Sequence, residues 1–119
     1  MIKMKLPATF ETLILEAKHF KLYKKLVQQL NKDFLYANVD LDFHEAILPS
    51  SLNVLLQETI YKIIQEKFTD YLNLLYIVDV PEYAVRTLNV DDTVMLAKQV
   101  SFLILKREWQ KVWFRYAYS

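Results

Sequence analysis

The chain has 119 residues, a net charge of +1, no glycine and no cysteine. Without glycine, P-loops, dinucleotide-binding turns and Gly-rich kinase loops are not expected, because each needs backbone that a side chain would obstruct. Without cysteine, the chain can form no disulfide, no thiolate zinc site and no thiol nucleophile. The length fits one domain, which we expect to span 1–119.

The first predicted element is an amphipathic helix over about 9–32, where apolar residues recur every three or four positions and Thr9 can serve as the N-cap. Residues 35–44 then alternate between apolar and polar, which is the period of a strand. A glycine-free chain is poorly suited to hairpins, and two strands alone form a marginal sheet. We therefore expect an extended connection at 35–47 whose apolar side lies under the helices. The alternative is an α+β fold with a minor two-stranded sheet from 35–44 and 72–80.

The longest predicted helix covers about 50–79, between Pro49 and Pro81, and keeps the helical period throughout. A short helix near 81–88 is expected to follow, since proline is tolerated at the first helical position. The last helix is predicted over about 92–116. The sequence thus predicts an all-α fold. We expect a small helical bundle of three principal helices and one short helix, with the 50–79 helix in the centre.

Large rings are frequent in this chain, especially near its C-terminal end. It contains eight Tyr, seven Phe and two Trp, which is more than a small core easily buries. Aromatic residues and arginine are also enriched at the centres of protein interfaces. We therefore expect a small non-catalytic protein-protein interaction or assembly protein, which acts as a homodimer or binds another protein. The candidate interface residues are Trp109, Trp113, Phe114 and Tyr116.

Basic residues alternate with these rings, which is the composition of a surface that binds single-stranded nucleic acid. The candidate nucleic-acid contacts are Lys106, Arg107, Lys111 and Arg115. Stacking on bases needs rings and cations side by side, whereas the helical spacing places Trp109 on one face and Lys111 on another. A nucleic-acid-binding module is therefore the first alternative function, and the near-neutral net charge argues against it.

One cluster has the side chains for chemistry: Asp40, Asp42, His44 and Glu45. In an extended segment the first three of these side chains point to the same face, and two carboxylates with an imidazole can bind a divalent cation or move a proton. Alternating acids are equally typical of the exposed side of a half-buried segment, and an EF-hand loop would need its glycine. A metal-dependent enzyme is thus the second and less favoured alternative.

Five tyrosines could line a small-molecule pocket between helices, although rings at helical spacing more often belong to a core: Tyr36, Tyr61, Tyr71, Tyr76 and Tyr83. The sequence gives no reason to expect a cofactor, a metal or an enzymatic activity. No apolar run reaches the length of a signal peptide or a membrane span. We therefore expect a cytoplasmic protein without a membrane segment.

Overall fold

A computed structural model describes residues 5–88 and 91–118, and about these residues the fold prediction is confirmed: the protein is all-α. No strand occurs within the described ranges, so the alternative with a two-stranded sheet is wrong. The helices are α1 (Phe10–His19), α2 (Tyr23–Tyr36), α3 (Pro49–Glu66), α4 (Phe68–Val78), α5 (Glu82–Arg86) and α6 (Thr93–Ala117).

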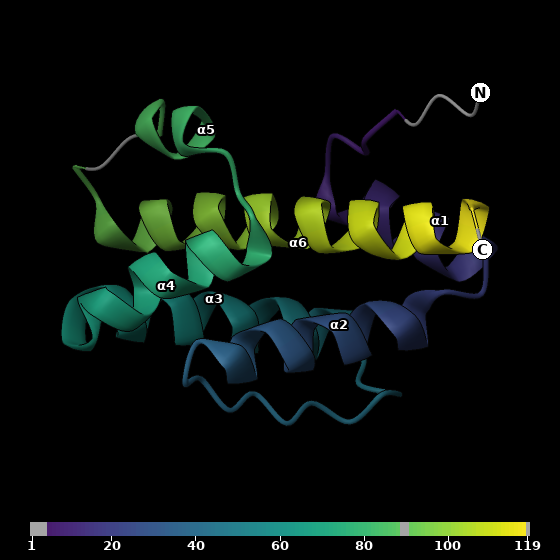
Figure 1. The fold of residues 1–119 in the computed structure, drawn as a ribbon, viewed down its shortest axis with the longest axis horizontal. Helices are drawn as coiled ribbons and strands as arrows, with labels where there is room; N and C mark the ends of the chain where they lie inside the picture. The colour runs from purple at the N-terminus through teal and green to yellow at the C-terminus, as the bar shows by residue number, and fades with distance from the viewer. Residues whose placement is uncertain (1–4, 89–90, 119) are drawn as a thin grey trace.

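The organising element is α6, which runs along the length of the molecule in Figure 1 and packs against α1, α2, α3 and α4. α2 and α4 lie on one side of α6, α3 lies behind them, and the short α5 lies on the opposite side. The predicted centre was the 50–79 helix instead. α6 takes this position because it is unbroken over 25 residues and is capped by Asp92, whose side chain accepts hydrogen bonds from the N–H groups of Val94 and Met95.

Both of the other long predicted helices are divided. The predicted 9–32 helix is split into α1 and α2 at Lys21, which has a positive φ of 58°. The predicted 50–79 helix is split into α3 and α4 at Lys67, which has φ −141° and ψ 62°. A continuous helix over 50–79 would be about 45 Å long. The longest extent of the molecule is 38 Å, so the break at Lys67 allows α4 to fold back onto the core.

Three helices end in a left-handed residue that is not glycine, because the chain contains none. These residues are Lys21 after α1, Asn38 after α2 and Asp79 after α4. Asn and Asp tolerate this conformation better than other non-glycine residues. After α4 the turn is closed by the N–H of Val80, which donates to the carbonyl of Leu75. This turn sets the position of Asp79 beside α6.

The connection between α2 and α3 is irregular rather than a strand, and its apolar side faces the helices as expected. Val39 is buried, and Leu41, Phe43 and Ile47 pack against the core. The side chain of Asn31 holds this segment by accepting from the N–H of Phe43 and donating to its carbonyl, at 3.0 and 2.8 Å. The alternation that resembles a strand in sequence therefore arises from a half-buried connection.

Candidate functional site

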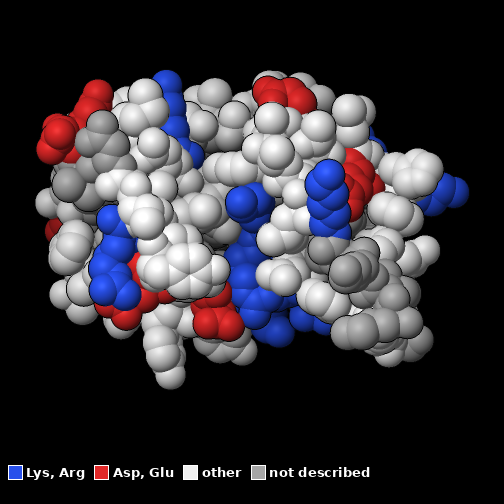
Figure 2. Space-filling model, turned by 90° about the horizontal axis from the view of Figure 1, so that it is seen from above, with Lys and Arg blue, Asp and Glu red and all other residues white. Residues whose placement is uncertain are grey.

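The predicted nucleic-acid contacts do not form one basic surface. Figure 2 views the molecule from the side of α5 and α6 and shows Lys and Arg side chains near the middle of this face, with Asp and Glu beside them. Lys106 and Arg107 border a depression here, and the Lys106 Nζ lies 5.3 Å from the centre of the Phe102 ring. Arg115 is exposed in a different place, beside Lys25. Lys111 points into the molecule.

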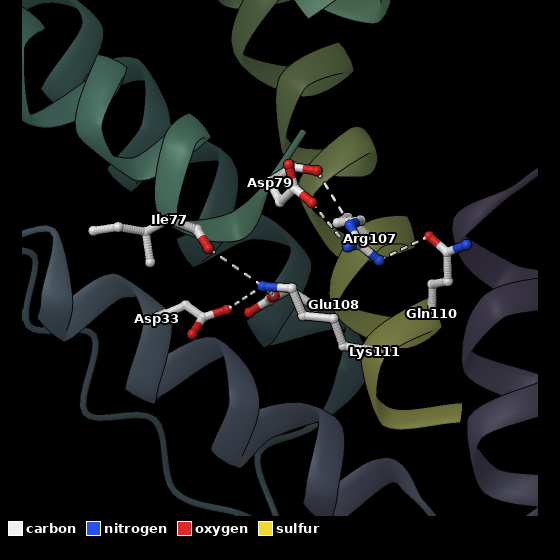
Figure 3. Close-up of polar contacts among 7 residues, drawn as sticks. All are labelled: Asp33, Ile77, Asp79, Arg107, Glu108, Gln110 and Lys111. Carbon is white, nitrogen blue, oxygen red and sulfur yellow. Dashed lines mark hydrogen bonds and ion pairs between the residues drawn. The ribbon is translucent and has the colours of Figure 1, made fainter. Parts of the chain in front are cut away.

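Lys111 belongs to a buried cluster of charged side chains that joins α2, α4 and α6 (Figure 3). Its Nζ donates to Asp33 Oδ2 at 2.8 Å and to the Ile77 carbonyl at 3.4 Å. The same nitrogen lies 3.2 Å from Glu108 Oε1. The exposed fractions of the side chains are 18% for Lys111, 7% for Asp33 and 0% for Glu108. The cluster is therefore shielded from solvent on the side of both carboxyl groups.

The two carboxyl groups of this cluster have opposite pKa shifts. Burial raises the pKa of Glu108 to about 9, and its hydrogen bond with Asp33 and the charge of Asp33 raise it further against the effect of Lys111. Burial acts on Asp33 in the same direction, but hydrogen bonds with Glu108, Lys111 and Gln29 outweigh it and lower the pKa of Asp33. At neutral pH the cluster thus holds an ionised Asp33, a charged Lys111 and a protonated Glu108.

The geometry fits a Glu108 that keeps its proton. The Lys111 Nζ lies 3.2 Å from Glu108 Oε1 but donates its hydrogen bonds to Asp33 and Ile77, so neither carboxyl oxygen of Glu108 has a well-aligned donor among the described residues. A protonated carboxyl group can instead donate to Asp33. The charges of the Asp33 carboxylate and the Lys111 ammonium group then cancel, and the protonated Glu108 adds none. The absence of a net charge reduces the free energy needed to bury the three side chains.

A second ion pair lies nearer the surface, beside the buried cluster (Figure 3). Arg107 donates from Nε to the Asp79 carbonyl at 3.1 Å and from one terminal nitrogen to Asp79 Oδ2 at 3.0 Å. Its other terminal nitrogen donates to Gln110 Oε1 at 3.1 Å. Each nitrogen of the Arg107 side chain thus donates one hydrogen bond within the chain, and Lys111 is largely buried. Lys111 is therefore largely withdrawn from the surface, whereas Arg107 is partly exposed and already paired with Asp79.

The sequence does indicate the buried cluster, because two charged residues stand at positions where the helical period predicts apolar ones. Glu108 lies three residues after Leu105 and four before Val112, on the apolar stripe of α6. Asp33 occupies the equivalent place on α2, three residues after Leu30 and four before Ala37. A charged residue on an apolar stripe indicates a buried pair, but only the packing of α2 against α6 identifies the partner.

The candidate interface rings are largely used inside the chain. Trp109 is fully buried, and its Nε1 donates to Glu16 Oε1 at 3.4 Å. Trp113 packs on Trp109 and on Phe20, with ring centres 6.2 and 4.5 Å apart. Tyr116 lies 5.5 Å from Trp113 and is half exposed. The sequence analysis named Trp109 as an interface residue. Its side chain instead lies fully within the core, so it cannot anchor an interface. Trp109 and Trp113 thus contribute to a cluster of rings with Phe20, at the end of α1.

Phe114 is the fourth candidate and lies apart from this group. It is partly exposed and stacks on Tyr118, with ring centres 5.7 Å apart.

The acidic residues of the connection do not assemble into a metal site. Asp40, Asp42 and His44 border an open depression between the connection and α3. Asp42 has a positive φ of 47°, which breaks the extended geometry that would align the three side chains. Glu45 turns away and pairs with Lys24 at 3.2 Å. Within the described ranges, no group of three or more His, Asp or Glu side chains could hold a metal ion.

The five tyrosines do not converge on a pocket. Tyr71 is buried in the core, whereas Tyr36, Tyr76 and Tyr83 are exposed on three different helices. Tyr61 is half-buried and lines a groove of about 330 Å³ between α3 and α6. These side chains therefore belong to separate parts of the molecule.

The surface feature that the sequence analysis missed is the outer side of α4. Phe68, Leu72 and Tyr76 are spaced four residues apart and are 55%, 50% and 86% exposed. We call Phe68, Leu72 and Tyr76 the α4 face. The sequence analysis placed these residues in the central 50–79 helix, because it did not foresee the break at Lys67.

No helix within the described ranges has both the length and the apolar character required to cross a lipid bilayer. The chain matches no protein-family model, no curated protein and no solved structure. Its function is therefore argued from the geometry alone.

Proposed function

We propose that this protein is a non-catalytic protein-protein interaction or assembly protein that acts as a homodimer. The observation that carries the proposal is the α4 face, where large apolar side chains are exposed to water along a whole helix. Monomeric proteins rarely expose contiguous apolar patches larger than a few hundred Å², and larger patches mark interaction sites. A second copy of the chain would remove this face from water.

The state of the ionisable groups also supports a structural role. Asp33, Glu108 and Lys111 have the shifted pKa values and close contacts that often mark catalytic sites. A catalytic group must however reach a substrate, and the side chain of Glu108 is fully buried. These three groups instead connect α2, α4 and α6, so that the surface they support is held in place.

The proposal is tested by the mass of the protein in solution, measured by light scattering coupled to size exclusion at low and at high salt. We expect twice the chain mass of 14.2 kDa, independent of salt and without the ultraviolet absorbance of nucleic acid. An apolar interface predicts this salt independence, because screening acts on charges. A protein that is monomeric at every concentration would contradict the homodimer. Bound nucleic acid that is released at high salt would favour the alternative function.

A further inference from the structure

The α4 face has the shape of a ridge that can pack against a copy of itself. Its three residues on α4 follow one another at intervals of four, which is the spacing of the ridges that interlock when helices pack. Two such ridges cross at about −50°. α4 lies in front of α3 in the view of Figure 1, so its outer side is not covered by that helix.

The residues of this ridge are arranged symmetrically about Leu72. Phe68 lies four residues before Leu72 and Tyr76 lies four residues after it. In an antiparallel two-fold arrangement with Leu72 near the axis, Phe68 of one subunit meets Tyr76 of the partner subunit. An aromatic pair then lies on each side of a central leucine pair. Such ring pairs stabilise contacts beyond the area that they bury.

The charges on α4 are compatible with this pairing. Asp70 is the only Asp, Glu, Lys or Arg between Phe68 and Val78, and it lies outside the ridge. No lysine or arginine is brought close to its own copy at the centre, where like charges would repel. The centre of the contact would therefore be uncharged, as the centres of stable interfaces generally are.

The exposed apolar area is close to what a stable dimer needs. A standard interface buries about 800 Å² per partner, and in homodimers roughly 500 Å² of that is apolar. If a large ring has about 200 Å² of surface, the exposed parts of Phe68 and Tyr76 amount to roughly 280 Å². Leu72, which is half exposed, adds to this area. The face thus provides most of the apolar centre of an interface of ordinary size.

Two other apolar surfaces fit a second copy less well. The groove between α3 and α6, lined by Val54, Tyr61 and Val94, is concave. Two facing copies of it would enclose an empty space between them. The rings at the end of α6 already contact one another and Phe20. Of these surfaces, only the α4 face is both exposed along its length and convex.

We infer that two copies of this chain associate through their α4 faces, by a two-fold packing of α4 against α4 with Leu72 near the axis. This inference rests on the proposed homodimer and specifies its surface. It also assigns the interface to residues outside the C-terminal helix.

The first test is Leu72→Glu, with Leu15→Glu as the matched control on α1. Both leucines are at least half exposed, so neither change should unfold the chain. Each dimer of the first variant carries two carboxylates near the axis, and we expect its dissociation constant to rise by about a hundredfold or more. The control should have the dissociation constant of the parent. Both are measured by sedimentation velocity over a range of concentrations.

The second test uses the absence of cysteine in the chain. In Leu72→Cys, a single thiol near a two-fold axis can meet its copy, whereas in Leu15→Cys it cannot. We expect rapid formation of a disulfide-linked dimer on oxidation only in the first variant, read on a non-reducing gel. This result does not depend on whether Leu72→Glu folds.

The outcomes separate the inference from the function on which it rests. A parent protein that is monomeric throughout would overturn both. A dimeric parent whose Leu72→Glu variant remains dimeric, and whose Leu72→Cys variant oxidises no faster than the control, would overturn the α4 interface and leave the homodimer standing. A dimeric parent, a monomeric Leu72→Glu variant and selective oxidation at position 72 would support the inference.

Discussion

Two regions of the molecule reverse the usual placement of residues: the buried charge cluster puts charged side chains in the interior, and the α4 face puts large apolar side chains on the surface. Asp33, Glu108 and Lys111 place ionisable groups inside the molecule, whereas Phe68 and Tyr76 place large rings in water. The charges are compensated within one chain, by a short ion pair between Lys111 and Asp33 and by the proton that Glu108 retains. Phe68 contacts the Tyr71 ring of the same helix, with ring centres 5.5 Å apart, but 55% of Phe68 and 86% of Tyr76 remain exposed. Buried charged groups that are paired within the chain therefore indicate a structural role, whereas large rings that remain exposed to water indicate an interaction surface.

The two regions are also mechanically connected. The Lys111 Nζ contacts both Asp33 and the carbonyl of Ile77, near the end of α4. Arg107 binds Asp79, the residue that ends α4. The polar contacts of α6 thus fix the position of the helix that carries the exposed face.

The largest expected effect is on the buried cluster. Lys111→Met removes the cation and leaves Asp33 buried without its partner, so we expect a loss of about 3 to 5 kcal/mol in the free energy of unfolding at neutral pH. The measurement is chemical denaturation followed by circular dichroism. Arg115→Met, on the exposed side of the same helix, is the control and should change stability by less than about 0.5 kcal/mol. Equal effects of the two changes would contradict a buried role for Lys111.

The two sides of α4 allow a comparison within one helix. Leu74 is fully buried, and Leu74→Ala should lower the free energy of unfolding by about 2 to 5 kcal/mol through loss of packing and the cavity left behind. Leu72→Ala, two residues away on the exposed side, should change it by less than about 0.5 kcal/mol. Both are measured by urea unfolding at concentrations where the chain is monomeric. A large loss for Leu72→Ala under these conditions would mean that the α4 face is part of the monomer core.

The pH dependence of stability tests the protonated state of Glu108. Its pKa is raised from 4.5 to about 9 in the folded protein. The resulting stabilisation is complete below pH 4.5 and is lost as the pH rises toward about 9, with a limiting slope of about 1.4 kcal/mol per pH unit. Asp33 acts in the opposite direction: its pKa is lowered, so its contribution is present above 3.8 and is lost as the pH falls through its folded-state pKa.

Glu108→Gln isolates the contribution of Glu108. The glutamine cannot ionise, and its amide can still donate to Asp33. We therefore expect the free energy of unfolding of this variant to vary less between pH 5 and 9 than that of the parent. Urea unfolding at a series of pH values measures both profiles. Parallel profiles would show that Glu108 does not hold a proton in the folded state.

The smallest effect is expected at the outer ion pair. The side chain of Asp79 is 76% exposed, so solvent screens its interaction with Arg107. Asparagine tolerates a positive φ as aspartate does, so Asp79→Asn removes the charge without disturbing the backbone. We expect it to lower the free energy of unfolding by at most about 1 kcal/mol, and by less at high salt. Thermal unfolding at two salt concentrations is sufficient to measure this. A loss as large as that of Lys111→Met would place this pair among the buried interactions.

Most of the fold was predictable because it depends on local signals. The period of three to four residues indicated helices almost everywhere. The aspartates before Thr93 indicated the start of the last helix, and Asp92 is its N-cap. The half-buried connection after α2 was also foreseen, since its alternating residues fit neither a helix nor a useful sheet.

The candidate site was much less predictable. Trp109 was expected at an interface and is in the core, whereas Phe68 was expected in a central helix and is exposed. Both differences follow from how the helices are arranged rather than from their own sequences. Whether a ring on the apolar side of a helix is buried in the core or left on the surface depends on whether another helix of the chain packs over it.

The sequence by itself determined the helical character of the chain. The apolar period, the N-cap residues and the lack of helix-weakening glycine are local features, each set by a few neighbouring residues. The tertiary structure alone decided the breaks at Lys21 and Lys67, since neither position carries a proline or glycine signal and both breaks allow helices to pack back on α6. It also decided that Glu108 meets Asp33 and Lys111, which are separated in sequence by up to 78 residues. Contacts of this kind depend on the packing of whole helices, and no local pattern records them.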